Sequence, residues 1–385
     1  MSLLKSTLCQ WLPVIGMLLL AACSTSNPAS TEKTGSAPES SSSTQFAAAK
    51  GCKNVGILLP ESDSSARYEA YDRPLLDQEI KAAIPGVTIQ YSNANNNAAT
   101  QQNQAEAALT KGACILVIDP NDSEQAAVIV QQAKASGVPV IAYDRLIQDP
   151  DVAYYVSFNN EKVGELQGQY VADQLAAGTM GLKRGANLVM INGAQTDNNA
   201  LLFRKGALSK LQPLIDKGDL KLVFDQYTPN WDNARAQSMM EGVLTKNSNN
   251  VQIVYAANDG LANTIIAALR VQNLNGKVLV TGQDATLTGI QNILSGDQGM
   301  TVYKPIAREA KATAKLVAAL SRGEDTSSLI NGKTELKGGQ SIPSLLETPI
   351  VVDQKNVADT VIKDGFLTKE EICKGSTAKA GSVCP

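Results

Sequence analysis

Short apolar runs alternate with longer amphipathic stretches along most of the chain. The runs are continuously apolar rather than alternating, as in Val55-Gly56-Ile57-Leu58-Leu59. Such runs are typical of parallel strands that are covered by helices on both faces. The first series predicts strands over 55–59, 87–91, 114–118 and 138–143, with helical stretches up to 83, over 98–111 and over 124–136.

A second series of the same kind begins near Val163. It predicts helices over 163–176, 203–217, 233–245 and 261–272, and strands over 187–191, 220–224, 252–256 and 278–281. Strand–helix–strand repetition implies right-handed crossovers and a doubly wound sheet. After residue 50 about 335 residues remain, more than one compact core usually serves. The sequence therefore predicts an α/β protein with two similar lobes in tandem.

Polar side chains follow the predicted strands at their carboxyl ends. The five clusters are Asp144-Arg145, Asp197-Asn198-Asn199, Asn258-Asp259, Gln283-Asp284 and Lys304. Ligands of open α/β sheets bind beyond the carboxyl ends of the strands, so in a two-lobed protein these ends face one another across a cleft. Acids and amides in such loops often only cap helices. Capping alone is a poor account of clusters at all these ends.

A sugar matches the chemistry of these side chains. Each sugar hydroxyl both donates and accepts hydrogen bonds; Asp accepts, Asn does both, and Arg and Lys donate. Aromatic rings would cover the C–H faces of a pyranose. Trp231, which stands in a polar loop, and Tyr68 are the candidates. Aromatic residues make up only 4% of the chain, so a tryptophan in a polar loop is informative. Packing beneath its own loop is the alternative role for Trp231.

Composition excludes several other classes of function. With 34 basic and 37 acidic residues the formal charge is −3, which offers no basic surface for nucleic acid. Histidine is absent, which removes Ser-His-Asp and Cys-His catalysis and histidine-ligated metal sites. A glycosidase could use Asp144 and Asp284, but Arg145 and Lys304 in the same cleft would keep both acids ionised. We therefore expect a binding protein, with no catalytic residue, cofactor or metal.

The N-terminus has the features of an export signal. Lys5 precedes an apolar stretch over 12–20, which Leu20-Ala21-Ala22-Cys23 closes. This arrangement suits a lipoprotein signal peptide at 1–22, after which Cys23 is acylated and becomes the new N-terminus; an ordinary secretory signal is the alternative. Residues 23–50 are rich in Ser and Ala and are expected to be a flexible tether.

Four further cysteines are available for pairing: Cys52, Cys114, Cys373 and Cys384. In an oxidising compartment, four cysteines can form two disulfides in three alternative ways. We favour Cys52–Cys114, because each stands at the start of a predicted strand and these strands would be neighbours. We also favour Cys373–Cys384, which would close a small terminal loop. Free or buried thiols are the alternative. No C-x-x-C spacing suggests a redox or zinc site.

Several longer motifs carry a resemblance to a known family. They lie at 140–147, 156–167, 197–200, 282–285, 300–305 and 359–366, and the similarity covers nearly all of residues 53–372. The chain resembles the periplasmic sugar-binding proteins of ABC transporters, most closely the D-xylose-binding and multiple-monosaccharide-binding proteins.

This resemblance implies a type I periplasmic binding protein fold. Two doubly wound Rossmann-like lobes are joined by a three-segment hinge, with the ligand cleft between them. The crossings are expected near Ser157, Tyr303 and Pro343. The first lobe would hold 53–156 with 305–342, the second lobe 157–304 with 343–372, and 373–385 would form a C-terminal tail.

The resemblance also implies which side chains hold the sugar, with Trp231 stacking on it. They are Arg67, Asp144, Arg145, Asn199, Asn258, Asp284 and Lys304, with Asn198 and Asp259 as further candidates. Where the xylose-binding pattern has Glu-Arg-Trp after the first strand, this chain has Ala66-Arg67-Tyr68. The first stacking ring is therefore changed, and the sugar is left open between xylose and a related aldose such as glucose.

The implied function is that of an extracytoplasmic lipoprotein. It would close around one monosaccharide and deliver it to an ABC transporter permease that works with a separate ATPase. The expected partners are the sugar and the permease. The protein would contact the cell membrane through its lipid anchor only, in the periplasm or on the cell surface. No nucleic acid partner is expected, and the protein should be monomeric. A sugar sensor that presents its bound form to a chemoreceptor or histidine kinase is the alternative.

Overall fold

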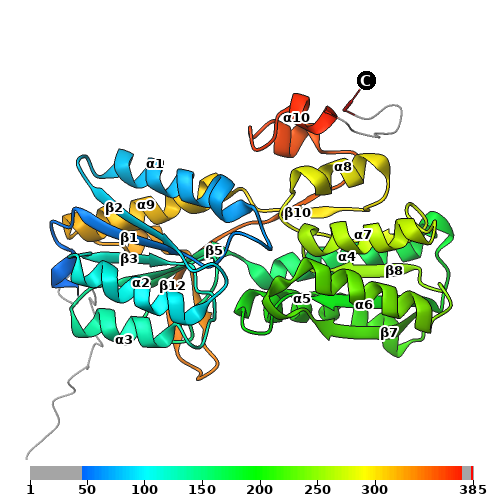
Figure 1. Cartoon of the computed structure of the whole chain (residues 1–385), viewed down its shortest axis with the longest axis horizontal. Helices are drawn as coiled ribbons and strands as arrows, with labels where there is room; N and C mark the ends of the chain where they lie inside the picture. Colours follow the sequence, from blue (N-terminus) through cyan, green and yellow to red (C-terminus); the bar gives the residue numbers. More distant parts are fainter. Residues whose placement is uncertain (1–45, 375–382, 385) are drawn as a thin grey trace, which may run out of the picture. The chain divides into compact units, whose positions relative to one another are not determined.

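The computed structural model describes residues 46–374 and 383–384. The predicted signal peptide, the predicted acylation site Cys23 and most of the predicted tether lie outside these residues. The described residues belong to one compact unit and contain three sheets (Figure 1). Within that part of the chain, no helix combines the length and the apolar character needed to span a bilayer.

A seven-stranded sheet forms the centre of the first lobe. Its strand order is β11-β12-β5-β4-β3-β1-β2, and all neighbours are parallel except β11 and β12. The strands are β1 (Asn54–Leu59), β2 (Thr88–Asn93), β3 (Ile115–Ile118), β4 (Val140–Tyr143), β5 (Tyr154–Phe158), β11 (Gly332–Glu335) and β12 (Ser341–Glu347). The helices are η1 (Ala47–Ala49), η2 (Tyr68–Asp72), α1 (Arg73–Ala83), α2 (Ala98–Thr110), α3 (Ala127–Ala135), α9 (Ile306–Arg322) and η5 (Ser327–Leu329).

The continuously apolar strands of this lobe contribute side chains to two hydrophobic cores, one on each face of the sheet. Successive side chains of a strand point to opposite faces. Ile57 and Leu59 of β1 therefore pack in one core and Leu58 in the other. Helices α1 and α9 cover the first face, and α2 and α3 cover the second (Figure 1). This two-sided burial is the physical reason why the runs read as continuously apolar.

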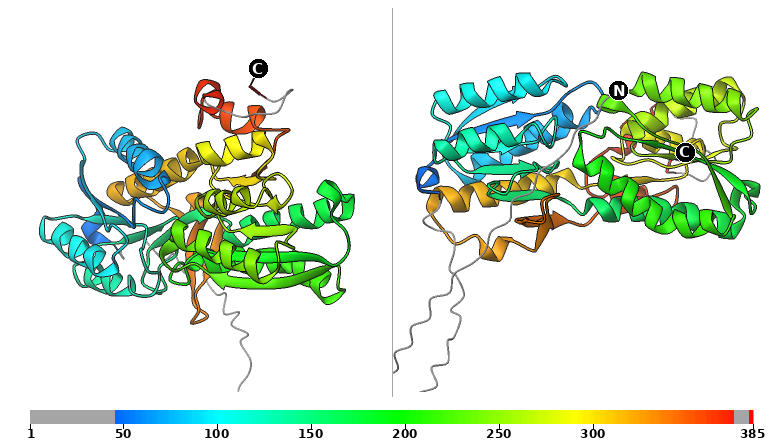
Figure 2. Two further views of the ribbon diagram at one scale, coloured as in Figure 1. Left: turned by 45° about the vertical axis from the view of Figure 1, so that its right-hand side comes forward. Right: turned by 90° about the horizontal axis from the view of Figure 1, so that it is seen from below.

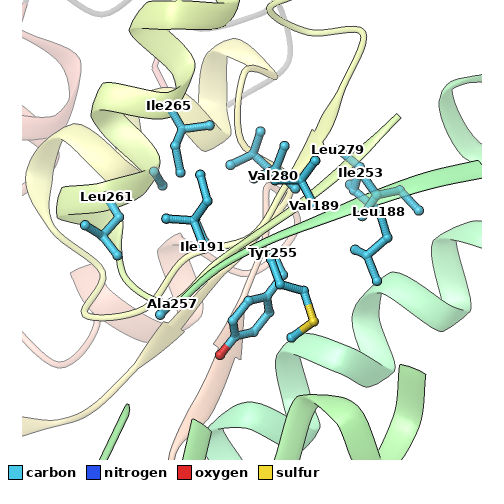
Figure 3. Packing of buried hydrophobic residues seen from close by; sticks show 14 of the residues in the cluster. Leu188, Val189, Ile191, Ile253, Tyr255, Ala257, Leu261, Ile265, Leu279 and Val280 are labelled. Atoms are coloured by element: carbon cyan, nitrogen blue, oxygen red, sulfur yellow. The ribbon is translucent and has the colours of Figure 1, made fainter. Parts of the chain in front are cut away.

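The second lobe is built on a four-stranded parallel sheet of order β7-β6-β8-β9. Figure 3 shows Leu261 and Ile265 on the same face of this sheet as Ile191, with Tyr255 on the other face. The strands are β6 (Ala186–Asn192), β7 (Leu220–Tyr227), β8 (Ile253–Ala256) and β9 (Leu279–Val280). The helices are α4 (Asn160–Ala177), η3 (Thr179–Gly181), α5 (Asn198–Asp216), η4 (Pro229–Trp231), α6 (Asn233–Lys246), α7 (Asp259–Val271) and α8 (Leu287–Ser295).

The chain passes between the lobes three times. The first passage follows β5, the second lies between β10 (Thr301–Tyr303) and α9, and the third lies between β12 and β13 (Ile350–Val352). Strands β10 and β13 pair with each other in antiparallel fashion. Two α/β lobes joined by three passages agree with the type I periplasmic binding protein fold expected from the sequence.

Two predicted lobe boundaries need correction. The boundary between 342 and 343 lies inside β12, which continues through Glu347 as a parallel neighbour of β5. The boundary between 156 and 157 likewise lies inside β5, which ends at Phe158. The two strands hold each other in place. They pair in parallel from Ser344↔Tyr155 to Glu347↔Phe158, so both segments stay in the first lobe's sheet.

Both favoured disulfides are present. Cys52–Cys114 joins the segments that enter β1 and β3, which are neighbours in the sheet. Cys373–Cys384 lies in the C-terminal segment, where η6 (Ala358–Ile362) and α10 (Lys369–Cys373) share a small core with α8 and β10. Helix α10 lies beside α8 (Figures 1 and 2).

Candidate functional site

A cavity lies between the carboxyl ends of the strands of the two lobes. Residues from both lobes and from the second passage between them line it. Nine of the predicted site residues are among these: Arg67, Tyr68, Asp144, Arg145, Asn199, Trp231, Asn258, Asp284 and Lys304.

Arg67 is held rigidly at the first-lobe wall. It directly precedes η2, and its side chain is 4% exposed. Nε and Nη2 donate to the two carboxylate oxygens of Asp72 at 2.9 and 2.7 Å, and Nη1 donates to Asp144 Oδ1 at 3.2 Å. Glu309 Oε2 lies 3.4 Å from Nη2. A two-pronged bond of this kind fixes the plane of a guanidinium.

Asp144 and Lys304 connect the first lobe to the second passage. Asp144 follows β4 with a φ of 51°, and Lys304 follows β10. Lys304 Nζ lies 3.3 Å from Asp144 Oδ1 and 3.6 Å from Asp284 Oδ1. Burial raises the pKa of Asp144, but Arg67, Lys304 and Arg145 outweigh burial and lower it to about 2. Asp144 is therefore a charged acceptor at neutral pH.

Arg145 bridges the two lobes. Its Nε lies 3.1 Å from Asp197 Oδ2 of the second lobe and 3.6 Å from Asp119 Oδ1 of its own lobe. Its Nη2 donates to the hydroxyl of Tyr68 at 3.0 Å. The guanidinium carbons of Arg67 and Arg145 lie 5.2 and 5.5 Å from the centre of the Tyr68 ring, within the range of cation–π attraction.

The second lobe contributes amides and an acid. Asn199, in the first turn of α5, donates to the carbonyl oxygen of Asp144 at 2.9 Å. Asn258 caps α7 by accepting from the N–H of Leu261 at 2.9 Å. Gln283 Oε1 and Asp284 Oδ1 are buried and accept no hydrogen bond from any described residue. These two acceptors are therefore available to ligand hydroxyls.

Trp231 and Phe203 supply the apolar wall. The centres of the two rings lie 6.5 Å apart in an edge-on arrangement, and Trp231 Nε1 donates to Asp197 Oδ2 at 3.1 Å. The indole lies so close to Gly193 that an added Cβ would come within 2.1 Å of it. Trp231 also has a φ of 54°, which is costly for a bulky residue and is typical of functional loops.

Asn198 and Asp259 do not line the cavity, contrary to prediction. The Asn198 N–H donates to Ser123 Oγ at 3.0 Å, and its Oδ1 accepts from Gln148 Nε2 at 2.9 Å. Asp259 is fully buried among groups of its own lobe. Each is the helix neighbour of a residue that does face the cavity. Successive helix residues point about 100° apart, so only one of each pair can do so.

Sequence reasoning missed six of the residues that line the cavity: Glu61, Ser64, Ser65, Asp197, Phe203 and Gln283. Asp197 and Gln283 belong to polar clusters that the sequence analysis recognised at strand ends, but other residues of those clusters were selected as sugar ligands. Phe203 lies one turn after Asn199 on α5, and this spacing puts both on one helix face. In the loop after β1 the resemblance pointed to Arg67 and Tyr68, and nothing beyond position at a strand end marked Glu61, Ser64 and Ser65.

Comparison with known proteins places the chain in a family. A family model described as a periplasmic binding protein domain matches residues 55–325. The D-xylose-binding periplasmic protein of Haemophilus influenzae is 40% identical over 330 residues, which is 86% of this chain and 95% of that protein. The multiple sugar-binding periplasmic receptor ChvE of Rhizobium radiobacter is 35% identical over 343 residues, which is 85% of this chain and 94% of that protein.

Among solved structures, an ABC transporter solute binding protein from Clostridium phytofermentans with bound β-D-glucose is similar at a TM-score of 0.76. It is 29% identical, and the match covers 83% of this chain and 100% of that one. These relatives are named for binding and not for catalysis, in agreement with the expectation of a binding protein. The chain therefore belongs to the periplasmic binding protein family, and its relatives include the D-xylose-binding and multiple sugar-binding periplasmic proteins.

Proposed function

We propose that this protein captures one neutral monosaccharide, D-xylose or a related aldose such as D-glucose, in the cavity between its lobes. The observation that carries the proposal is a cavity between the lobes that is walled by buried, charged hydrogen-bonding side chains from both of them. A site that matches every hydroxyl rejects analogues, because a mismatch leaves buried groups unpaired. The names of the relatives support the same class of ligand.

The charges around the cavity favour a neutral ligand over an anionic one. Arg67, Arg145 and Lys304 each lie within 4 Å of at least two carboxylates. A sugar phosphate or a sugar acid would therefore meet cations that are already neutralised and acids of its own charge. A hydroxyl can instead accept from a cation and donate to a carboxylate at the same time.

The contacts between the lobes support a closed, ligand-holding conformation. The Ser123 N–H of the first lobe donates to the carbonyl oxygen of Thr196 at 2.8 Å, and Asn233 Nδ2 of the second lobe donates to the carbonyl oxygen of Ser64 at 3.2 Å. Opening would break these bonds, so hinge motion about the three passages gives two states. In our proposal the closed state delivers the sugar to an ABC transporter permease.

We further propose that acylated Cys23 tethers the protein to a membrane. The pattern Leu20-Ala21-Ala22-Cys23 after an apolar stretch supports this. Growth of cells with a labelled fatty acid should label the wild-type protein and not the Cys23→Ser variant. Equal labelling of both would refute the anchor and leave the binding function untouched.

Calorimetric titration of the chain from residue 24 onward against xylose, glucose, galactose, arabinose and ribose tests the binding function. We expect saturable binding of at least one aldose. Asp284→Ala should weaken that binding by more than about 1.5 kcal/mol, because a charged acceptor is lost, which is a factor of more than about ten in Kd. Lys81→Ala, which removes an exposed ion pair on α1, is the control and should bind normally. No binding of any of these sugars would refute the proposal.

A further inference from the structure

The carboxylate of Asp259 accepts four hydrogen bonds within the second lobe, although it does not touch the cavity. Oδ1 accepts from Gln298 Nε2 at 2.8 Å and from Thr301 Oγ1 at 2.9 Å. Oδ2 accepts from the Thr286 N–H at 2.8 Å and from Thr286 Oγ1 at 3.3 Å. The Asp259 N–H donates to the carbonyl oxygen of Gln283 at 2.9 Å. One residue of α7 thus joins the loop after β9, the segment after α8 and the start of β10.

The loop that Asp259 holds is strained. Asp284 has a φ of 96° and Ala285 a φ of 51°, and such angles are unfavourable for residues with a side chain. A strained backbone persists only where its surroundings determine it strongly. Thr286 at the end of this loop donates two hydrogen bonds to Asp259, from its N–H and from its hydroxyl. The same loop carries Gln283 and Asp284, which line the cavity and whose Oε1 and Oδ1 atoms accept no hydrogen bond from the described residues.

Two glycines leave room for the Asp259 carboxylate. A Cβ on Gly282 would lie 2.1 Å from Oδ1, and a Cβ on Gly289 would lie 2.2 Å from Oδ2. Gly282 directly precedes the strained loop, and Gly289 lies in the first turn of α8. The packing is therefore shaped around a carboxylate at this position, with both oxygens used.

We propose that Asp259 is a positioning residue that fixes the Gln283–Thr286 loop, so that Gln283 and Asp284 present their acceptors to the sugar. The inference rests on the proposed function, because it assigns Asp259 a part in that same site. Through Thr301 the carboxylate also fixes the start of β10, whose far end leads to Lys304. Three of the groups proposed to bind sugar are thus oriented by one carboxylate that binds none.

Ionisation of Asp259 gives a characteristic readout. Burial raises the pKa of Asp259 to about 7, and the bonds from Gln298, Thr286 and Thr301 moderate the rise. Asp284 is the charged group that faces it; the other groups that contact the carboxylate are neutral. Protonation removes acceptor capacity that two N–H donors require, so the loop loosens and sugar affinity falls as the pH drops through about 7.

Folding stability responds to the same proton with the opposite sign. The pKa in the folded state lies above the ordinary value of about 3.9, so the folded protein binds the proton more tightly than the unfolded chain. The resulting contribution to the free energy of unfolding is fully present below about pH 4 and is lost as the pH rises through about 7. A purely structural role would not make sugar affinity and folding stability change in opposite directions.

The test compares Asp259→Asn with wild type and with Asp225→Asn, a matched control in the same lobe whose carboxylate pairs with Arg204. Titration with the best-bound aldose at pH 6, 7 and 8 should give a wild-type affinity that weakens several-fold toward pH 6. Asp259→Asn should bind at least about fivefold more weakly at pH 8, with little dependence on pH. Asp225→Asn should follow wild type. Wild-type affinity and pH dependence in Asp259→Asn would overturn the proposal.

A second measurement needs no sugar and separates this inference from the proposed function. The Thr286 amide donates to Asp259 Oδ2, so hydrogen exchange in the Gln283–Thr286 loop should accelerate in Asp259→Asn while exchange in β6 stays unchanged. Unchanged loop exchange would refute the positioning role even if sugar binds. Accelerated exchange in a protein that binds no aldose would refute the proposed function instead. If Asp259→Asn does not fold, Thr301→Val takes its place, because it removes one of the four hydrogen bonds to the carboxylate. It should show the same changes at smaller size. Wild-type behaviour of Thr301→Val would equally overturn the proposal.

Discussion

The ion pair between Arg145 and Asp197 allows a direct test of lobe closure. It joins the first lobe to the second with 3.1 Å between Nε and Oδ2. Asp197→Asn removes the charge and leaves one side-chain oxygen for the two donors that bond the carboxylate, Trp231 Nε1 and the Asn199 N–H. At an effective dielectric constant of about 20, two unit charges at this distance attract by about 5 kcal/mol.

Desolvation offsets much of that attraction. Burial raises the pKa of Asp197 although Arg145 lowers it, so the net contribution of the pair is well below the Coulomb figure. Close charge pairs across interfaces couple by about 1.5 kcal/mol or more. We therefore expect Asp197→Asn to weaken sugar binding by about 1.5–3 kcal/mol, which is roughly a factor of 10 to 150 in Kd. The loss should lie mainly in the dissociation rate, because the pair forms as the lobes close.

Asp119→Asn is the matched control. Asp119 lies 3.6 Å from the same guanidinium but belongs to the same lobe as Arg145, so this contact need not change when the lobes separate. Stopped-flow dissociation and calorimetry on both variants, each also combined with Arg145→Lys, complete a double-mutant cycle. Equal effects of the two Asp→Asn changes, or additivity in the Arg145–Asp197 cycle, would show that the pair does not stabilise the closed state.

Three further changes test other parts of the molecule. Phe366→Ala removes a ring stacked at 4.4 Å on Tyr71 of the first lobe; a loss of about 1 kcal/mol should speed sugar dissociation about fivefold, and full additivity with Tyr71→Ala would contradict a shared contact. Gly164→Ala places a Cβ 1.9 Å from a carbonyl oxygen of α5, so both the melting temperature and the sugar affinity should drop. Gly242→Ala is the control: a Cβ there meets nothing within 4 Å, and this variant should match or exceed wild-type stability. Replacing the Cys52–Cys114 pair by serines opens a loop with a sequence separation of 62, and urea unfolding should show a loss of roughly 4 kcal/mol in the chain-entropy account; a loss under about 1 kcal/mol would mean that the reduced chain is already restrained.

Local pattern was sufficient for most of the sheet and for the wall of the cavity. The continuous apolar runs predicted β1, β3, β4, β6 and β8, because a strand covered on both faces must be apolar throughout. Asp144, Asn258 and Asp284 were found because a parallel sheet brings the carboxyl ends of its strands to one edge. These properties depend on the order of residues within one strand–helix unit, so the sequence carries them directly.

The choice between neighbouring residues could not be made from the sequence. Asn198 and Asn199 have the same chemistry, Asn258 and Asp259 are both hydrogen-bonding side chains, and all four follow strands. Only the rotation of α5 and α7 against the sheet decides which member of each cluster faces the ligand. That rotation is set by packing between helices, where Gly164 and Gly206 let α4 and α5 approach closely.

The order of residues along the chain was enough to predict the α/β class, the two lobes, the Cys52–Cys114 disulfide between neighbouring strands and the polar chemistry of the strand ends. Folding added what no local pattern contains: β12 stays with the first lobe through Glu347, Arg145 faces Asp197 across the cleft and Asp259 bonds the loop behind the cavity. The two kinds of information differ in range. Periodicity and strand ends are local properties of the chain, whereas strand pairing, helix rotation and charge partners link residues far apart in sequence and exist only once the lobes have packed.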